Sequence, residues 1–147
     1  IYIYTYKYNY HINGIKADVD VFFDDLPIRL KAAHLVVCRA GASTLAELTA
    51  AGRPAIVFPY PYAIDDHQTI NSRSLEEAGG AIVMQEKQTT SEKLADLFLQ
   101  LFASPEWFIS AAKAALKIGK PNASKALADL VEGKTFSDEP IISSGIG

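Results

Sequence analysis

The chain has 147 residues, 49% of them hydrophobic, and its 14 basic and 17 acidic residues give a formal net charge of −3. This length and composition predict one folded domain with a sizeable core rather than a disordered chain. The absence of a dense Lys/Arg run argues against nucleic acid as a partner, and no apolar run approaches the ~20 residues that cross a bilayer.

The first ten residues, IYIYTYKYNY, carry Tyr at every even position. A period of two predicts a β-strand, because successive side chains of a strand point to opposite faces. Its Tyr face is expected either to pack on a core or to form a flat edge strand that self-associates. A turn at Asn13 and Gly14 ends this segment.

The next segment alternates again and then changes to a helical pattern. Alternation over residues 17–23, ADVDVFF, predicts a second strand. A helix up to about His34 follows, with Asp24 or Asp25 as its cap and Pro27 in its first turn.

Continuous apolar runs and helical patterns alternate along the remainder of the chain. The apolar runs predict buried strands, and Gly, Pro or capping residues bound the helices. Thr89 and Glu92 have the spacing of a capping box. Cys38, the single cysteine, lies in the first apolar run, which predicts a buried structural thiol and excludes a disulfide within the chain. In chain order we expect strands at 35–38, 54–60 and 81–85, and helices at 43–51, 67–78, 89–102, 104–118 and 122–132.

This order of elements predicts an α/β fold: a Rossmann-like, mostly parallel sheet with helices on both faces. Ligands of such sheets bind beyond the carboxyl ends of the strands. The loops after Phe23, Cys38 and Phe58 are therefore expected to line one crevice.

The motif LVVCRAGASTLAE, residues 35–47, reads as a strand, a tight turn and the start of a helix. Gly41 is predicted to let the backbone turn sharply. Short side chains follow, so that an anion can reach the free N–H groups of the helix start. The residues with these short side chains are Ala42, Ser43 and Thr44.

Glu47 lies one turn inside this helix, where its carboxylate can accept hydrogen bonds from a ribose diol. The spacing alone leaves a second interpretation equally open: Ser43 caps the helix, and Glu47 is an acid favoured by the helix dipole. Arg39 either pairs with phosphate or covers the turn. The G-x-G-x-x-G pattern of dinucleotide sites is absent, which argues against a typical NAD site.

A second polar group follows the next strand, in PYPYAIDDHQTIN, residues 59–71. Asp, His and Gln side chains at a helix start suit the recognition of sugar hydroxyls, because they donate and accept at fixed geometry. Helix capping by Asp65 or Asp66, with His67 and Gln68 exposed, is the stronger interpretation from spacing alone. A metal site has only one histidine to support it.

The sequence LVVCRAGASTLAELTAAGRPAIVFPYPYAIDDHQTINSRSLEEAGGA resembles the donor-binding half of the MurG-type glycosyltransferases, two-domain enzymes of the GT-B class in glycosyltransferase family 28. The specific part is the pattern CRAGAST..E followed by DDHQ..N. The resemblance extends from about residue 14 to residue 133. It implies transfer of N-acetylglucosamine from its UDP derivative to the lipid-linked muramyl-pentapeptide of peptidoglycan synthesis.

Site roles follow from this resemblance by position. Glu47 resembles the acid that binds both ribose hydroxyls, and residues 42–44 match the helix start that meets the diphosphate and the sugar. His67 and Gln68 match the pair that touches the sugar hydroxyls, although some members have Gln in place of His67. The backbone near Phe23 resembles the wall that reads uracil. The expected substrate-binding residues are Phe23, Arg39, Gly41, Ala42, Ser43, Thr44, Glu47, Asp66, His67 and Gln68.

The sequence also departs from the family pattern. The first strand and the Gly-rich loop of the donor half are absent, as is the acceptor-binding half, which carries the proposed catalytic base and the membrane-facing surface. We therefore expect residues 1–13 to be an unassigned Tyr-rich strand, 14–133 an incomplete donor domain and 134–147 a flexible tail. The chain alone is expected to be inactive, with no catalytic residue, metal or cofactor of its own.

The intact enzyme is expected to be cytoplasmic, with peripheral contact at the cytoplasmic face of the cell membrane and its lipid-linked acceptor bound through the missing domain. Two alternatives stay open. The chain is a stand-alone donor-binding subunit that pairs with a membrane partner, or it is a truncated, non-catalytic domain that self-associates through residues 1–10.

Overall fold

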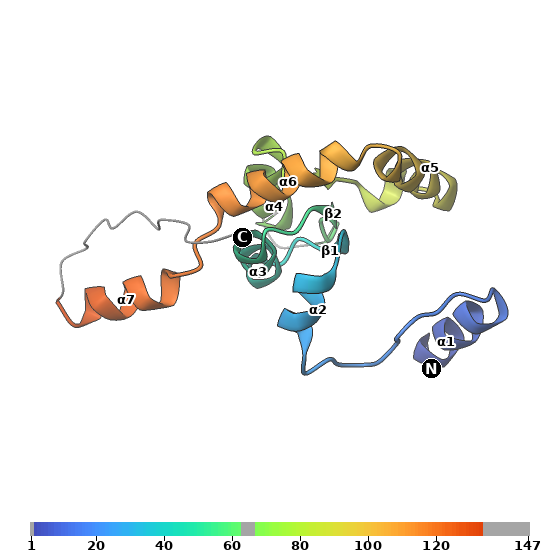
Figure 1. Ribbon diagram of the computed structural model, residues 1–147, viewed down its shortest axis with the longest axis horizontal. Coiled ribbons are helices and arrows are strands. Elements are labelled where there is room, and N and C mark those ends of the chain that lie inside the picture. The colour runs from blue at the N-terminus through green and yellow to red at the C-terminus, as the bar shows by residue number, and fades with distance from the viewer. Residues whose placement is uncertain (1, 63–66, 134–147) are drawn as a thin grey trace, which may run out of the picture. The chain divides into compact units, whose positions relative to one another are not determined.

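A computed structural model describes residues 2–62 and 67–133 of the chain. Contacts between Cα atoms divide the chain into two compact units, Ile1–Ala33 and His34–Gly147, and we describe each unit by itself. Figure 1 labels the helices α1 to α7 and the strands β1 and β2. Asp65, Asp66 and the predicted tail 134–147 lie outside the described residues.

The first unit begins with the helix α1, Tyr2–Ile12, so the strand predicted over residues 1–10 is wrong. Alternating Tyr residues also fit a helix, because Tyr6 and Tyr10 are four residues apart and share one side, as do Tyr4 and Tyr8. These four rings are exposed by 42–76% and form no core. A helix bonds its own N–H and C=O groups, whereas a strand needs a neighbour for them.

The strand predicted over residues 17–23 is also wrong, because this segment is irregular in the structure. The helix α2, Leu26–Ala32, follows as predicted, with proline in its first turn, and ends slightly before the expected position. Asp25 occupies the N-cap position, but its side chain does not cap the helix. It accepts a hydrogen bond from Arg29 Nε at 2.6 Å instead.

The second unit contains a parallel sheet of three strands in the order β1-β2-β3: Val36–Arg39, Ala55–Phe58 and Ala81–Val83. Cys38 pairs with Val57 across β1 and β2, and Val57 pairs with Val83 across β2 and β3. The carboxyl ends of all three strands therefore meet at one edge, as the sequence predicts for an α/β fold.

The helices of this unit match the predicted ones closely. One capping detail differs: Thr90, not Thr89, caps α5, and its side chain accepts from the N–H of Lys93 at 3.3 Å. The short 3₁₀ helix η2 was not predicted from the sequence. The helices are α3, Ala42–Ala51; α4, His67–Glu77; η2, Glu86–Gln88; α5, Ser91–Phe102; α6, Pro105–Ile118; and α7, Ala123–Val131.

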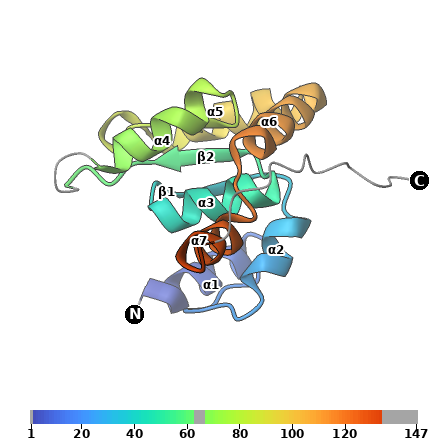
Figure 2. The ribbon, with the colours of Figure 1, turned by 90° about the vertical axis from the view of Figure 1, so that its left-hand side faces the viewer.

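The helices α3 and α4 pack on each other beside the sheet, and α6 packs against both of them (Figure 2). The core lies between these helices and the central strand, where Leu48, Ile56 and Leu75 are at most 1% exposed. Gly52 ends α3 in the left-handed conformation, with φ 61°. A Cβ atom there would lie 2.5 Å from Leu116 Cγ of α6, so this close packing of α3 and α6 requires glycine.

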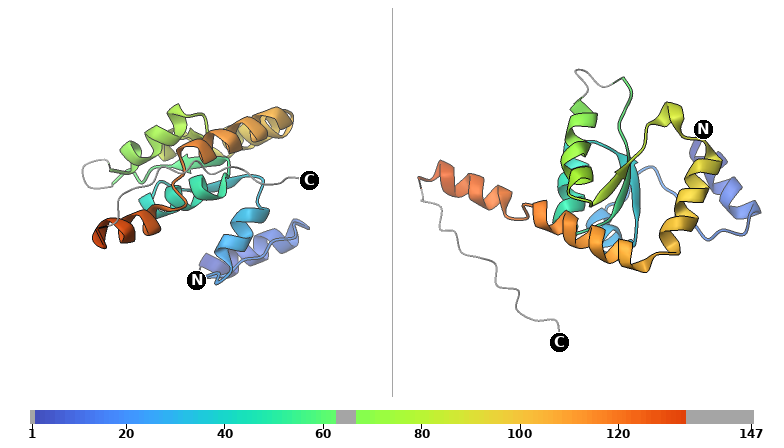
Figure 3. Two further views of the ribbon diagram at one scale, coloured as in Figure 1. Left: turned by 60° about the vertical axis from the view of Figure 1, so that its left-hand side comes forward. Right: turned by 90° about the horizontal axis from the view of Figure 1, so that it is seen from above.

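The opposite face of the sheet is only partly covered. Figure 3 shows α4 and α5 on opposite sides of the strands. Val37 of β1 remains 47% exposed on the less covered side. Within the described ranges, no helix is long and apolar enough to cross a membrane.

Candidate functional site

The N-terminus of α3 directly follows the carboxyl end of β1. Leu45 N–H is the first to bond within the helix, to the carbonyl of Gly41 at 3.0 Å. The N–H groups of Ala42, Ser43 and Thr44 therefore have no partner within the helix, and no side chain caps them. Ala42 and Ser43 are exposed, so a ligand can reach this end of the helix.

Gly41 is the N-cap of α3, but its backbone is ordinary extended chain, with φ −65° and ψ 137°. The turn from β1 into α3 does not use the conformational freedom expected of Gly41, because any residue adopts these angles. A Cβ atom at this position would lie 3.5 Å from Thr44 Oγ1, which is ordinary contact. Glycine leaves the approach to the three N–H groups free of a side chain.

Glu47 lies in α3, four residues after Ser43, so the two side chains share one side of the helix. Glu47 is exposed, and it makes no ion pair or side-chain hydrogen bond within the part of the chain that the structure describes. A carboxylate in this state can accept two hydrogen bonds from a vicinal diol.

Arg39 ends β1, and its guanidinium is paired rather than free at the start of α3. Its Nη1 atom lies 2.9 Å from Glu86 Oε2 in η2. The hydrogen bond between them raises the pKa of Arg39 and lowers that of Glu86. Arg39 Cζ also lies 5.8 Å from the centroid of the Tyr60 ring. Arg39 therefore contacts the segments that follow β2 and β3.

A cavity of about 410 Å³ lies beside the ends of β1 and β2, lined by Val37, Cys38, Arg39, Phe58, Glu86, Thr89, Thr90, Ser91 and Leu94. Burial raises the pKa of the Cys38 thiol to about 11. Cys38 is therefore protonated at neutral pH, which supports a structural thiol rather than a nucleophile.

The second predicted polar group begins α4. Gln68 Oε1 accepts a hydrogen bond from the backbone N–H of Tyr60 at 2.9 Å. The Gln68 carbonyl is thus occupied, and its NH₂ group remains to donate. His67 is exposed at the first position of α4. The predicted Asp66 lies outside the described residues, among which no three potential metal ligands cluster.

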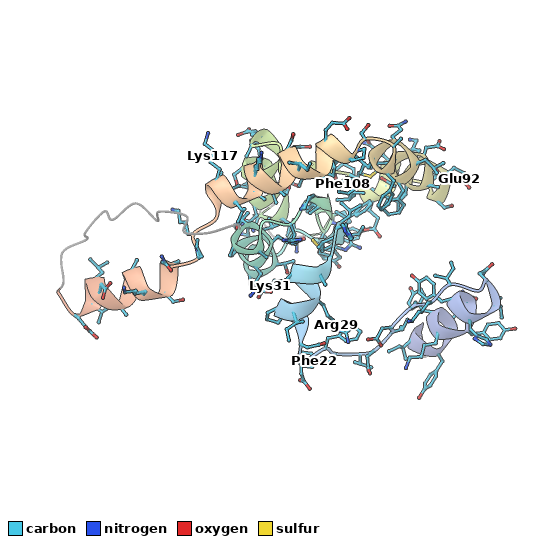
Figure 4. All side chains as sticks on the ribbon, viewed as in Figure 1. Phe22, Arg29, Lys31, Glu92, Phe108 and Lys117 are labelled. Atoms are coloured by element: carbon cyan, nitrogen blue, oxygen red, sulfur yellow. The ribbon has the colours of Figure 1, made fainter. Side chains whose placement is uncertain are left out.

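Phe23 belongs to the first unit, where Arg29 contacts its ring. The Arg29 Cζ atom lies 3.9 Å from the ring centroid. Arg29 also forms ion pairs at 2.6 Å with Asp18 and with Asp25. These contacts hold the segment before α2 against the helix; Figure 4 labels Arg29 there.

Two residues that contact the Arg39 guanidinium were not singled out from the sequence: Tyr60 and Glu86. Tyr60 lies inside the PYPY run, where its position between prolines was the available signal. Glu86 is separated from Arg39 by 47 positions, and nothing in the local sequence indicates their pairing.

Residues 3–130 match the model of the glycosyltransferase family 28 C-terminal domain. The match begins within α1, so it includes residues before residue 14, where the resemblance was expected to start. The chain is 52% identical over 124 residues to a protein of Paramagnetospirillum magneticum named UDP-N-acetylglucosamine–N-acetylmuramyl-(pentapeptide) pyrophosphoryl-undecaprenol N-acetylglucosamine transferase; this covers 84% of the chain and 33% of that protein. A protein of the same name from Rhodospirillum rubrum is 50% identical over 122 residues, covering 83% and 32%.

A solved structure gives the same relationship. The crystal structure of Acinetobacter baumannii MurG superposes with a TM-score of 0.75 at 34% identity, covering 81% of the chain and 34% of MurG. The chain thus spans about a third of the length of the relatives it matches. This similarity confirms the predicted α/β fold and the family resemblance.

Proposed function

The chain belongs to the glycosyltransferase family 28 C-terminal domains, and from that membership we propose that it binds UDP-N-acetylglucosamine as the donor half of an inverting glycosyltransferase. The observation that carries the proposal is the exposed N-terminus of α3 with Glu47 one turn inside it. The relatives are named as N-acetylglucosamine transferases, which supports the choice of donor.

The diphosphate binds at the start of α3 in this proposal. The N–H groups of residues 42–44 point out of the helix, and the helix dipole adds partial positive charge there. When the sugar leaves, negative charge grows on the UDP, and these fixed dipoles stabilise it without a metal ion. The Ser43 and Thr44 hydroxyls are available as further donors.

The nucleoside and the sugar use other predicted residues. Glu47 accepts hydrogen bonds from the two ribose hydroxyls. His67 and Gln68 contact the sugar hydroxyls, with Gln68 as a donor because its carbonyl is bonded to Tyr60. Asp66 belongs to the same proposed group. Phe23 lies in the first unit, and its uracil-reading role stays a prediction from the resemblance, separate from this group of residues.

The acceptor step is proposed for the enzyme as a whole. A base other than these donor-binding residues deprotonates the acceptor hydroxyl, which attacks the anomeric carbon and inverts it. The acceptor is lipid-linked muramyl-pentapeptide, which the names of the relatives support. We place the reaction at the cytoplasmic face of the cell membrane, with peripheral contact.

Calorimetry tests the ribose role of Glu47. The chain is titrated with UDP and with 2′,3′-dideoxy-UDP, which lacks both hydroxyls. Glu47→Ala is expected to weaken UDP binding by about tenfold to a hundredfold, the effect of losing hydrogen bonds to a charged group. It should leave the dideoxy analogue almost unaffected. Equal UDP affinity in the variant and the wild type contradicts the assignment.

A further inference from the structure

The guanidinium of Arg39 is held between the segments after two other strands. On one side, Nη1 pairs with Glu86 Oε2 of η2 at 2.9 Å. On the other, Cζ lies 5.8 Å from the Tyr60 ring centroid, within the range of a cation–π contact. The ends of β1, β2 and β3 are thus joined through one side chain.

Tyr60 carries this connection to α4. Its backbone N–H donates to Gln68 Oε1 at 2.9 Å. The position of Tyr60 therefore fixes the orientation of the Gln68 amide, with the carbonyl toward Tyr60 and the NH₂ group away from it. An N–H donor can meet only the carbonyl end of that amide. The Gln68 NH₂ group therefore keeps its direction only while Tyr60 keeps its place.

A second contact secures the same segment from η2. The rings of Tyr60 and Tyr62 meet edge to face, with centroids 5.7 Å apart. Lys87 Nζ lies 5.4 Å from the Tyr62 ring centroid. Two adjacent residues of η2 thus hold Tyr60 and Tyr62 in place: Glu86 acts through Arg39, and Lys87 contacts Tyr62 directly.

We propose that Arg39 is a positioning residue, which holds Tyr60 and through it the donor amide of Gln68, rather than a ligand of the diphosphate. The inference rests on the proposed function, since it assigns the effect of Arg39 to the sugar end of that site. Glu86 neutralises the Arg39 charge at close range, whereas the α3 N–H groups stand unpaired for an anion in the described structure.

The two roles of Arg39 predict different responses to the two ligands UDP and UDP-N-acetylglucosamine. We would measure both affinities by calorimetry on the 147-residue chain. Arg39→Gln is expected to lose about tenfold in affinity for the UDP-sugar and less than about twofold for UDP. Glu86→Gln should weaken sugar binding in the same direction, because it loosens Arg39, and leave UDP unchanged.

If Arg39 instead bound the diphosphate directly, the variants would behave differently. Arg39→Gln would then weaken the binding of both ligands equally, and Glu86→Gln would strengthen the binding of both by releasing the cation; either result overturns the proposal.

Tyr60→Leu keeps the backbone N–H but removes the ring. It should match Arg39→Gln, and the double variant should lose little more than either single variant. Additive losses would contradict the proposed connection.

Lys117→Gln is the matched control for the loss of one positive charge. Lys117 lies exposed on α6, and Figure 4 shows its side chain extending from that helix. Its affinities should equal those of the wild type. Thermal melts of all variants separate unfolding from a local effect. A wild-type chain that binds neither ligand contradicts the proposed function itself, whereas UDP binding with the wrong variant pattern contradicts only the role of Arg39.

Discussion

Arg29 joins several side chains of the first unit. It pairs with Asp18 and Asp25 and covers the ring of Phe23. The hydrogen bond from Arg29 is the main cause that lowers the pKa of Asp25. A carboxylate with a lowered pKa stabilises the folded state above its unfolded pKa, and this stabilisation is lost as the pH falls through the folded value.

We therefore predict that acid loosens this contact only below about pH 4, the ordinary range of aspartate. Replacing Arg29 by Met should return the Asp25 pKa upward toward that range, as followed by NMR of the carboxyl group. Lys31→Met is the control, because Lys31 is exposed on the same helix and makes none of these contacts. The same Asp25 pKa in Arg29→Met and wild type would contradict the prediction.

Single residues also show where sequence reasoning stops. The exposed start of α3 was predictable, because short side chains after an apolar strand are adjacent in the sequence. The pairing of Arg39 with Glu86 was not, since it depends on how β1 and the segment after β3 approach each other. The ordinary extended conformation of Gly41 was not predictable, because a glycine in a sequence does not reveal whether its conformation needs one.

At the scale of elements, the parallel sheet and its helices were predictable from continuous apolar runs and from helix boundaries. Residues 1–10 were not, because an alternating Tyr pattern fits both a strand and pairs four residues apart on a helix. The hypothesis of self-association through a flat Tyr-rich strand loses its basis, because these residues form the helix α1. The pairing of the chain with a separate membrane subunit stays a prediction.

The contact between α3 and α6 gives a prediction at this scale. Gly52→Ala places a methyl group 2.5 Å from Leu116 Cγ at a position with φ 61°. Both the strain and the overlap are expected to destabilise the fold, by about 1–3 kcal/mol in total. The measurement is the free energy of unfolding in urea.

Gly79→Ala is the matched control for that experiment. Gly79 also has a positive φ, 83°, but a Cβ atom there would meet nothing within 4 Å. It should therefore cost only the backbone strain, and less than Gly52→Ala. Equal costs for the two variants would show that the contact with Leu116 contributes nothing.

At the scale of the whole molecule, the chain matches about a third of the length of its relatives, and we propose that this part binds the donor. Donor binding and acceptor chemistry are separate tasks in the proposed mechanism. In that proposal the second unit contributes the N–H groups at the start of α3 and the Glu47 carboxylate, and neither requires a catalytic base. Binding of UDP-N-acetylglucosamine is therefore the property to measure on this chain.

The most direct test is an amide NMR titration of the chain with UDP-N-acetylglucosamine, with UDP and N-acetylglucosamine as separate controls. We expect UDP and the UDP-sugar to shift the backbone amides of Ala42, Ser43 and Thr44 most strongly, because these N–H groups receive the diphosphate in the proposed site. The free sugar should leave those amides unchanged. Saturable binding that leaves all three amides unshifted would contradict the central claim.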